Sequence, residues 1–310
     1  MLQAIQESVD DFLNLSLNLP TDSLLAYHRM ASSVHTLCSV VREAEDMQQP
    51  RSEILSVLEP ARLLHKQSAF IERLQKWPRG YVGDFETIEY ICDNSVKAVP
   101  NTPAFYLEHQ ALRTVASQQH RNKIQWQAKY ICETSLLHNE ARILSIACGS
   151  SRDIRSIQEV LKKVNTHFFL NDADSEALQF SFNYLEDLTP EITLIPGNVF
   201  KLIRDFSALQ PFHLIVAGGL FDYLTDRQIE WLVPKLVALL RSNGSLRFTN
   251  IAPGNPDRVW MEYLADWHII ERSEADVQRL LNNTKESNDV EINIERDSTG
   301  LTLLIELRRK

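Results

Sequence analysis

The spacing of apolar residues changes near residue 140. Before that point they recur every three or four positions, as on the buried face of amphipathic helices, and glycine is almost absent. After residue 141, short apolar runs alternate with amphipathic segments. The pattern therefore predicts a helical N-terminal part followed by a part that mixes strands and helices.

The N-terminal part is expected to form several long helices. Thr21 or Asp22 can cap a helix after the break at Pro20. A second helical segment, residues 50–77, should be kinked or divided at Pro60, because proline lacks the amide hydrogen that a helix needs. Residues 101–103 are predicted to cap a further helix that continues to residue 130.

The pattern of apolar segments in the second half is typical of a doubly wound α/β domain. Short apolar strands between amphipathic helices indicate a parallel sheet that is covered on both faces. The expected strands are 143–146, 167–170, 192–195, 212–216 and 245–250, and the expected helices are 153–164, 175–186, 199–206 and 226–240, with a turn at Asn243-Gly244 before the fifth strand.

The C-terminal tail departs from this alternation. Segments 288–295 and 301–307 are joined by Asp297-Ser-Thr-Gly300, which is typical of a hairpin. We expect this hairpin to add antiparallel strands at the edge of the sheet. The predicted organisation is a helical cap or lid over residues 1–135 and an α/β domain over residues 136–310.

Composition and charge narrow the classes of partner. The chain has 310 residues, with 32 Lys and Arg against 41 Asp and Glu, which gives a formal charge of −9. A net negative charge disfavours nonspecific electrostatic binding to nucleic acid or anionic membranes. No apolar run is long enough to cross a bilayer, and the N-terminus does not have the pattern of a signal peptide. We expect a small-molecule ligand, no nucleic acid, no membrane insertion, and either a monomer or a homodimer.

The cysteines and histidines do not form a recognisable metal or disulfide pattern. The four cysteines are far apart and contain no C-x-x-C pair. The nine histidines show no H-E-x-x-H spacing. These patterns favour a reducing cytoplasm and no metal site.

The turn after the first expected strand suits a nucleotide. Small residues, Ala147-Cys-Gly-Ser-Ser151, lie between strand 143–146 and a helix that starts at Asp153. Small side chains let the backbone approach a ligand closely, and the first amides of the helix point towards it.

The ends of the second and third strands carry further candidates. Asp172 comes 25 positions after Ala147, near the spacing at which a carboxylate accepts hydrogen bonds from ribose hydroxyls. The other interpretation is a helix cap, which Asp174 fills equally well, so both roles can hold. Asn198, after Gly197, is either a partner for an adenine edge or a turn residue.

The fourth strand runs into Gly218-Gly-Leu-Phe-Asp-Tyr223. Two glycines allow close approach of a ligand. Phe221, Asp222 and Tyr223 would then face the cleft or begin the next helix, and Tyr223 is equally suited to core packing.

A glycine-containing loop, residues 77–87, interrupts the helical part. Asp84 is placed to cap the helix that follows. One interpretation is a connector in which Arg79 pairs with a nearby carboxylate. The other is a lid, in which Arg79 holds a ligand carboxylate and Tyr81 forms an aromatic wall.

The order of these motifs resembles class I S-adenosylmethionine-dependent methyltransferases over residues 120–310. The motifs Arg79-Gly-Tyr-Val-Gly-Asp84 and Trp260-Met-Glu-Tyr-Leu-Ala-Asp-Trp267 look like a bacterial subgroup that is associated with methyl esters of 3-hydroxy fatty acids. The resemblance implies a seven-stranded sheet of order 3-2-1-4-5-7-6. Three positions depart from the family turn: Ser145 replaces the usual acidic residue, and Ala147 and Ser151 replace glycines.

The resemblance also implies a cofactor, S-adenosylmethionine, and a methyl transfer to a small carboxylate, hydroxyl or amine acceptor in secondary or signalling metabolism. The cofactor-binding residues would be Arg79, Ala147, Cys148, Gly149, Ser151, Asp172, Ala173, Asn198, Val199, Gly218 and Gly219. The catalytic residues would be Tyr81, Asp222, Tyr223 and Glu262.

The acceptor and the exact chemistry stay open at this point. Glu262 and Asp266 lie four positions apart in an expected helix, 257–267, and would share a face, as a solvated edge or as functional carboxylates. The departures in the turn leave room for reactions that release methylthioadenosine, namely cyclisation to a cyclic amino acid or aminocarboxypropyl transfer. A protein that only senses the nucleotide is the alternative from another class.

Overall fold

The computed structural model describes residues 1–187, 191–209 and 211–310, in two compact units. Unit 1 comprises residues 1–118 and 255–268, and unit 2 comprises residues 119–254 and 269–310. The expected boundary between residues 135 and 136 falls near the end of helix α7 (Val115–Leu137). The division comes earlier because α7 contributes to the core of unit 2, for example through the fully buried Ile131.

Unit 1 consists of helices whose caps follow the sequence signals. Asp22, rather than Thr21, caps α2 by accepting from the Leu25 amide at 2.7 Å, and Asp84 caps α5 by accepting from the Thr87 amide at 2.9 Å. Such caps satisfy amides that have no partner inside the helix. The helices of unit 1 are α1 (Leu2–Leu17), α2 (Ser23–Asp46), α3 (Arg51–His65), α4 (Ala69–Lys76), α5 (Phe85–Asp93) and α6 (Pro103–Arg113).

Two helix breaks differ from the prediction. Pro60 lies inside α3 and does not divide it. The division comes after Lys66, because the Ser68 side chain caps α4 by accepting from the Ile71 amide at 3.3 Å. The helix expected from residue 103 to 130 is two helices, α6 and α7, since Thr114 takes an extended ψ of 154° between them.

The segment from the C-terminal half that belongs to unit 1 was predicted as an α-helix, and this was wrong. It contains a five-residue π-helical turn, η2 (Trp260–Leu264), and Asp266 beyond it has a left-handed φ of 56°. Glu262 and Asp266 therefore do not share an α-helical face.

Side chains of α3 and α4 hold this segment by its backbone. Arg51 Nη2 donates to the Glu262 carbonyl at 2.7 Å, and Gln75 Nε2 donates to the Leu264 carbonyl at 2.6 Å. Backbone carbonyls that lack a regular helical partner are satisfied in this way.

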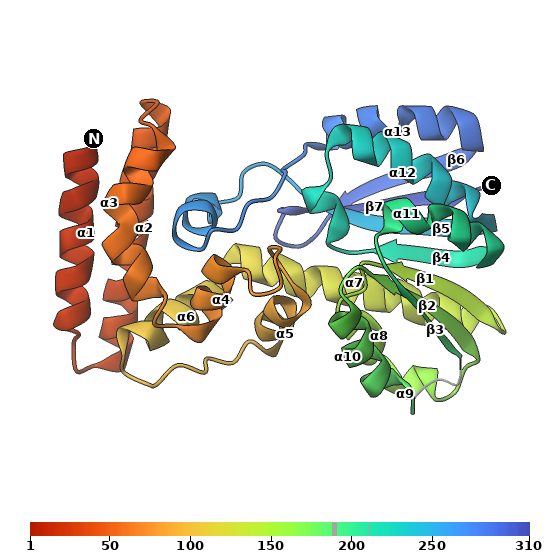
Figure 1. Ribbon diagram of the computed structural model, residues 1–310, viewed down its shortest axis with the longest axis horizontal. Helices are drawn as coiled ribbons and strands as arrows, with labels where there is room; N and C mark the ends of the chain where they lie inside the picture. The colour runs from red at the N-terminus through yellow and green to blue at the C-terminus, as the bar shows by residue number, and fades with distance from the viewer. Residues whose placement is uncertain (188–190, 210) are drawn as a thin grey trace. The chain divides into compact units, whose positions relative to one another are not determined.

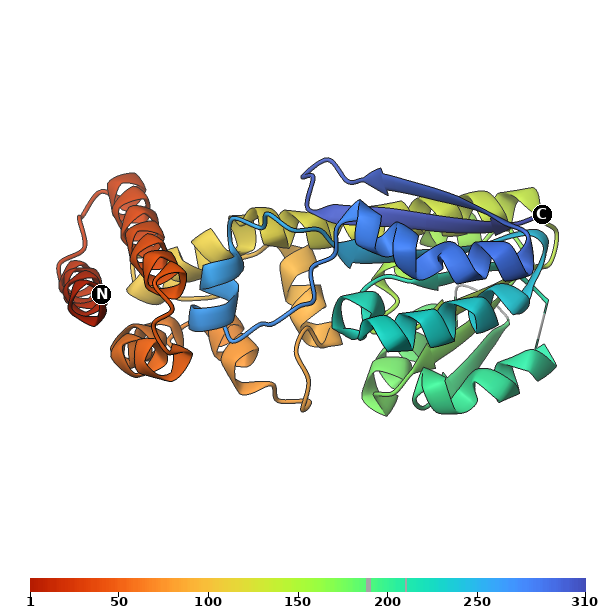
Figure 2. The ribbon, with the colours of Figure 1, turned by 90° about the horizontal axis from the view of Figure 1, so that it is seen from above.

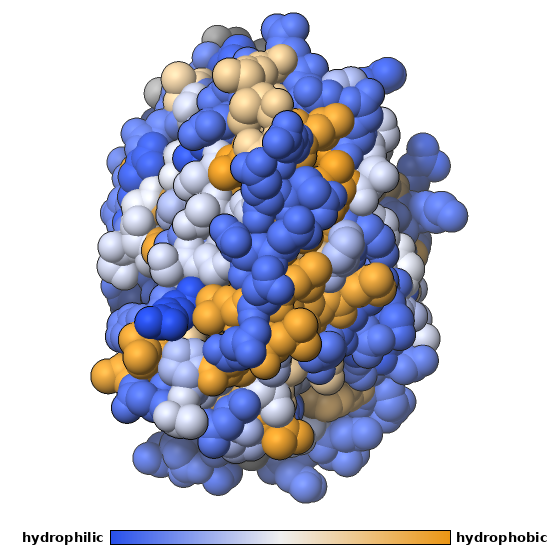
Figure 3. All heavy atoms as spheres, turned by 90° about the vertical axis from the view of Figure 1, so that its left-hand side faces the viewer, coloured by the Kyte–Doolittle hydropathy of each residue, from blue (hydrophilic) through white to orange (hydrophobic). Residues whose placement is uncertain are grey.

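The outer helical face of unit 1 mixes apolar and polar side chains. Figure 3 shows orange apolar atoms between blue polar ones on the side formed by the first helices. Large apolar side chains with exposed surface in these helices include Leu17, Leu24, Leu25 and Leu63. Exposed apolar residues of this kind are common on folded proteins.

Unit 2 is built on one seven-stranded sheet of order β3-β2-β1-β4-β5-β7-β6 (Figures 1 and 2). Strands β1 to β5 pair in parallel, and β7 pairs antiparallel with both β5 and β6. The order and the antiparallel last pair confirm the expected fold class. The strands are β1 (Ala141–Ile146), β2 (Thr166–Asp172), β3 (Ile192–Pro196), β4 (Phe212–Ala217), β5 (Leu240–Ile251), β6 (Val290–Arg296) and β7 (Thr302–Arg309).

Helices cover both faces of this sheet. Apolar residues of α7 to α10 form one core with alternate residues of β1, β2 and β4, and those of α11 to α13 form the other core. Phe168 and Phe169 of β2 point into different cores, as the two-residue period of a strand requires. These helices are α8 (Arg152–Arg155), α9 (Gln158–Leu161), α10 (Ser175–Leu185), α11 (Val199–Leu209), α12 (Asp226–Ala238) and α13 (Glu274–Asn288).

Two details of unit 2 correct the prediction. The single helix expected over residues 153–164 is two short ones, α8 and α9, separated at Ser156 and Ile157. Asn243 and Gly244 do not precede β5 but lie inside it, where the pairing with β4 is irregular. Gly244 is required there, since an added Cβ would lie 2.9 Å from the Phe212 carbonyl oxygen.

The predicted tail hairpin is confirmed. Its turn is closed by the Gly300 amide, which donates to the Asp297 carbonyl at 2.9 Å. Gly300 has a φ of 76°, a left-handed conformation that glycine adopts without strain.

Candidate functional site

The strand order of unit 2 reverses between β1 and β4. Chains leave these two neighbouring strands towards opposite faces of the sheet, and in open α/β sheets ligands bind at the carboxyl ends of such strands. The residues that follow β1, β2, β3 and β4 are therefore the ones with access to a ligand at this edge.

The turn after β1 has an unusual backbone. Ala147, Gly149 and Ser151 have left-handed φ values of 49°, 54° and 50°. Left-handed geometry costs a residue with a Cβ about 1–2 kcal/mol, so Ala147 and Ser151 are held there by their surroundings. The Cys148 amide donates to the Asn171 carbonyl at 3.0 Å, and the Ser181 hydroxyl donates to the Gly149 carbonyl at 2.8 Å.

Asp172 is the last residue of β2 and meets this turn directly. Its Oδ2 accepts from the Gly149 amide at 2.8 Å, and its Oδ1 accepts from the Asp174 amide at 2.9 Å. Asp174 separately caps α10, with its side chain accepting from the Glu176 amide at 2.9 Å. Asp174 thus forms the expected helix cap, and the role of Asp172 towards a ribose stays a prediction.

Burial controls the ionisation of Asp172. The residue is 9% exposed, and desolvation raises the pKa of its carboxyl, while the hydrogen bonds from the amides oppose that rise. The carboxylate is oriented by the backbone but is only partly solvated.

Asp153, at the start of α8, is a polar residue in this turn that sequence reasoning missed. It is 4% exposed, and burial raises the pKa of its carboxyl to about 6. Its Oδ1 accepts from the Ile154 amide at 2.9 Å. Burial likewise raises the pKa of the nearby Cys148 thiol, with further contributions from Asp172 and Asp153. The sequence signal was a carboxylate in the first turn of a helix, which is usually exposed.

The residues after β3 begin α11. Asn198 is exposed, and its Oδ1 accepts from the Phe200 amide at 2.9 Å, which is the geometry of a helix cap. Val199 is 5% exposed and packs in the core. Ala173, after β2, is exposed beside the turn.

The paired glycines after β4 have different surroundings. A Cβ on Gly218 would lie 2.3 Å from the Gln127 side-chain nitrogen, so this glycine makes room for α7. A Cβ on Gly219 would meet nothing within 4 Å. The close approach predicted for a ligand at Gly218 is therefore made by Gln127, and only Gly219 adjoins open space.

Asp222 lies in the short helix η1 (Leu220–Tyr223) and forms a buried ion pair with Lys123 of α7. The Lys123 Nζ to Asp222 Oδ2 distance is 2.6 Å, and the side chains are 3% and 2% exposed. Asp222 Oδ1 also accepts from the Ile251 amide at 2.7 Å. Because both oxygens have buried partners, this geometry favours a structural role over the predicted catalytic role.

The neighbours of Asp222 are divided between core and surface. Phe221 is fully buried and stacks on Phe248 with ring centroids 4.0 Å apart, so it does not face a cleft. Tyr223, at the end of η1, is half-buried. Of this group, Tyr223 keeps the most access to a ligand.

The remaining predicted residues belong to unit 1. Arg79 Nη2 lies 3.3 Å from Glu86 Oε1, and its guanidinium stands 4.4 Å from the centre of the Phe85 ring. Tyr81 is 41% exposed. These contacts agree with the interpretation of the loop as a connector, and the role of Arg79 and Tyr81 towards a ligand stays a prediction.

Glu262 is part of an ion-pair network in unit 1. Its carboxylate lies 3.1 Å from Arg258 Nη1, and Arg258 also pairs with Glu45 at 2.6 Å. Charges that are engaged in this way are usually structural, and a catalytic role for Glu262 stays a prediction.

A metal centre and a membrane-spanning helix are other kinds of functional element. Among the described residues, no group of three or more histidine, cysteine, aspartate or glutamate side chains could hold a metal ion. Within the same residues, no helix has the length and apolar character needed to cross a membrane.

The chain is similar to known proteins in fold and not in sequence. No family model matches the chain, and no curated protein matches it in sequence. A possible exported protein from Bordetella parapertussis is similar in structure, with 10% identity, 99% of this chain and 94% of that chain covered, and a TM-score of 0.57.

Two further solved structures match with TM-scores below 0.5. Magnesium protoporphyrin IX methyltransferase from Synechocystis, with bound SAM, has 10% identity over 64% of this chain and 85% of its own, with a TM-score of 0.44. The plantazolicin methyltransferase in complex with SAH has 13% identity over 84% of this chain and 98% of its own, with a TM-score of 0.46.

Proposed function

We propose that unit 2 binds S-adenosylmethionine at the turn after β1 and that the protein transfers the methyl group to a small-molecule acceptor. The proposal is supported by the sheet order, by the reversal between β1 and β4, and by the motifs that resemble class I methyltransferases. The observation that carries it is the carboxylate of Asp172, which is fixed at the end of β2 beside the turn.

The residues present fit the ribose of such a cofactor. The Asp172 carboxylate accepts from the amides of Gly149 and Asp174, with the Ala173 amide as a further donor, and a carboxylate has about four acceptor positions. It can therefore accept a ribose hydroxyl without losing the bonds that orient it. Gly219 leaves space at the end of β4, and the amide nitrogen of Asn198 can donate to an adenine edge while its oxygen caps α11.

The residues expected near the methionine part of the cofactor depart from the family pattern. Ser145, in place of the usual acid, is 3% exposed. Asp153 brings a different buried carboxyl to the turn. We propose that Asp153 supplies the negative charge that the family usually places on the strand.

The bound cofactor would supply a methyl group on a sulfonium, and the protein's part would be to position the acceptor and exclude water. An acceptor carboxylate requires no base, whereas a hydroxyl or amine does. Because Asp222 is engaged with Lys123 and Ile251, we assign the orienting role to Tyr223 in preference to Asp222.

Cofactor binding is tested by calorimetry with S-adenosylhomocysteine on Asp172→Ala and on the control Asp174→Ala. Loss of hydrogen bonds to a charged group is worth about 1.5–3 kcal/mol, so Asp172→Ala should bind about ten- to a hundred-fold more weakly. Asp174→Ala removes a helix cap but keeps the proposed ribose contact, and should bind nearly as wild type. Equal affinities of wild type and Asp172→Ala would contradict the ribose assignment.

The reaction is tested by incubation with S-adenosylmethionine and a panel of carboxylate, hydroxyl and amine acceptors. Methyl transfer leaves S-adenosylhomocysteine, which mass spectrometry identifies. Methylthioadenosine would instead indicate cyclisation or aminocarboxypropyl transfer. Tight binding without turnover across the panel would indicate a nucleotide sensor.

The role of Arg79 is tested on the same reaction. If Arg79 holds a carboxylate of the cofactor or the acceptor, Arg79→Ala should raise the apparent KM or abolish turnover. Glu86→Ala, which removes a carboxylate that pairs with both Arg79 and Arg73 in unit 1, serves as the control. Kinetics of Arg79→Ala equal to wild type would leave Arg79 as a connector residue.

A further inference from the structure

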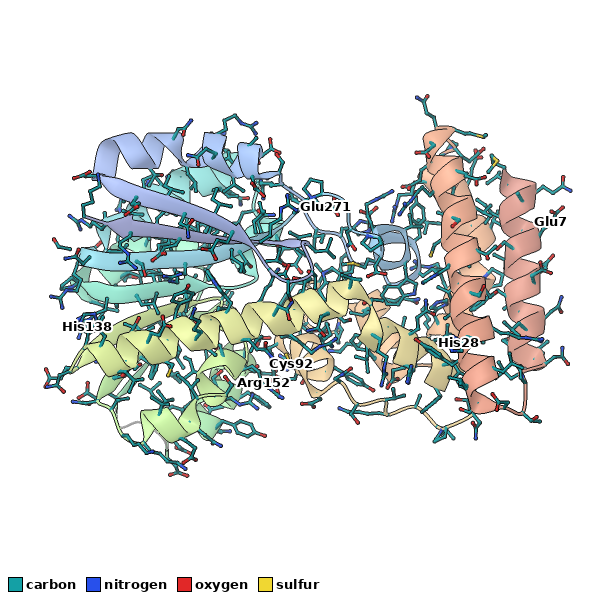
Figure 4. The ribbon with its side chains drawn as sticks, turned by 180° about the vertical axis from the view of Figure 1, so that it is seen from behind. Glu7, His28, Cys92, His138, Arg152 and Glu271 are labelled. Atoms are coloured by element: carbon teal, nitrogen blue, oxygen red, sulfur yellow. The ribbon has the colours of Figure 1, made fainter. Side chains whose placement is uncertain are left out.

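Four basic side chains gather at the amino edge of the sheet in unit 2. Arg142, His213 and Arg241 are each the second residue of adjacent strands, β1, β4 and β5. His138 follows α7, and its ring centroid lies 4.4 Å from that of His213. Figure 4 shows His138 at the other end of the unit from Arg152, which begins α8 after the turn described above. We call these four residues the basic edge cluster.

Both ring nitrogens of His213 face hydrogen-bond donors, and a neutral imidazole can accept at only one of them. The Arg142 amide donates to His213 Nδ1 at 3.0 Å, and Arg241 Nη1 lies 2.5 Å from His213 Nε2. A neutral imidazole carries one hydrogen, so accepting at Nδ1 places that hydrogen on Nε2. There it faces the guanidinium of Arg241, which has only hydrogens to offer.

Arg142 adds another unsatisfied donor. Its guanidinium stacks 4.7 Å from the centre of the Phe169 ring and donates through Nη2 to the Leu209 carbonyl. Its Nε is buried and has no hydrogen-bond partner in the described part of the chain. Unmade hydrogen bonds of buried donors are costly, and such groups usually have a partner.

The basic edge cluster also has no counter-charge. No carboxylate of the described residues forms an ion pair with any of the four side chains, and Glu191 nearby pairs with His167 instead. Burial, together with the neighbouring His138, Arg241 and Arg142, lowers the pKa of His213 to about 4. In a protein with a formal charge of −9, uncompensated basic groups at one place require an explanation.

We propose that the basic edge cluster is a binding site for a small oxyanion, either inorganic phosphate or the phosphate group of a small ester. One oxygen would accept from His213 Nε2 and from Arg241 together, which removes the conflict between the two donors. Arginine and imidazole groups around an anion give charge-assisted hydrogen bonds of this kind. The site is separate from the carboxyl edge where we propose that the cofactor binds, and its test does not depend on the proposed reaction.

The test is calorimetry of the full-length protein with potassium phosphate and with glycerol 2-phosphate, each against potassium chloride at equal ionic strength. We expect saturable binding of phosphate or of the ester but not of chloride, and the tighter of the two ligands indicates the source of the anion. Arg241→Gln should weaken that binding at least ten-fold. Arg227→Gln, which removes an exposed arginine from α12, should bind as wild type.

A second readout reports on the cluster itself. Phosphate should shift the histidine NMR signals that His138→Gln and His213→Asn remove, and should leave other histidine signals in place. Circular dichroism confirms that the variants fold. Binding that is equal in wild type and Arg241→Gln, or shifts that chloride reproduces at the same ionic strength, would overturn the proposal.

Discussion

Replacing Asp153 by asparagine should make the protein more stable at neutral pH and leave it nearly unchanged in acid. The carboxyl is buried and its pKa is raised from 3.8 to about 6. A raised pKa means that the folded state favours the protonated form. The contribution of this group to stability is therefore complete below pH 3.8 and is lost as the pH rises through 6.

The size of the effect follows from that pKa. Each pKa unit corresponds to about 1.4 kcal/mol, so the ionised carboxyl costs the folded state about 3 kcal/mol above pH 7. At pH 4 the same linkage gives a cost below about 1 kcal/mol. Asparagine has nearly the same shape and does not ionise, so it removes the part of the cost that depends on pH.

The assay is urea unfolding of wild type and Asp153→Asn at pH 4 and at pH 7.5, without ligand. The difference in free energy of unfolding between the two proteins should grow by about 2–3 kcal/mol from the lower to the higher pH. Any effect of the substitution that is independent of pH cancels in this comparison. Asp205→Asn, at an exposed position of α11, controls for the loss of one negative charge. A difference that stays constant between the two pH values would refute the reasoning.

Three more substitutions test the surroundings of the loop after β4. Gly218→Ala should destabilise the protein by about 0.5–1.5 kcal/mol in urea unfolding, because its Cβ would push the end of the buried Gln127 side chain away from its hydrogen bond to the Lys123 carbonyl. The neighbouring Gly219→Ala has open space around it and should change the free energy of unfolding by less than about 0.5 kcal/mol, so equal losses would contradict the packing argument. Lys123→Met leaves the buried Asp222 carboxylate without its charged partner and should lower the free energy of unfolding by about 3–5 kcal/mol, whereas a loss below about 1 kcal/mol would show that the pair is not buried in solution.

The sheet could be predicted because its signals are local. Each strand is a short apolar run, and several of the helices that follow have a capping residue of their own, as with Asp174 before α10. The positions of Asp172 and Gly149 follow from the same strand-turn-helix pattern, and a hydrogen bond joins the two residues.

The contacts that the prediction missed join distant parts of the chain. Lys123 is 99 residues away from Asp222 in sequence, and a lysine in a helix is usually solvated. Nothing local therefore indicated that the pair is buried. For the same reason Gly218 looked like a ligand position, although the side chain that requires it comes from α7.

The error at residues 257–267 has a different cause. The apolar residues of that segment have a helical spacing, but its carbonyls bond to Arg51 and Gln75 instead of continuing an α-helix. The tertiary partners thus outweigh the local preference, which a periodicity alone does not reveal.

The discontinuity of unit 1 has a consequence for how the chain folds during synthesis. Its helices α1 to α6 leave the ribosome first, but Arg51 and Gln75 meet their backbone partners only after residues 119–254 have been made. Contacts of such long sequence separation form late and slow the folding of the part that needs them. A fragment that ends at residue 118 should consequently be a poor stand-alone protein. An excised version of unit 1 would need residues 255–268 supplied through a new linker.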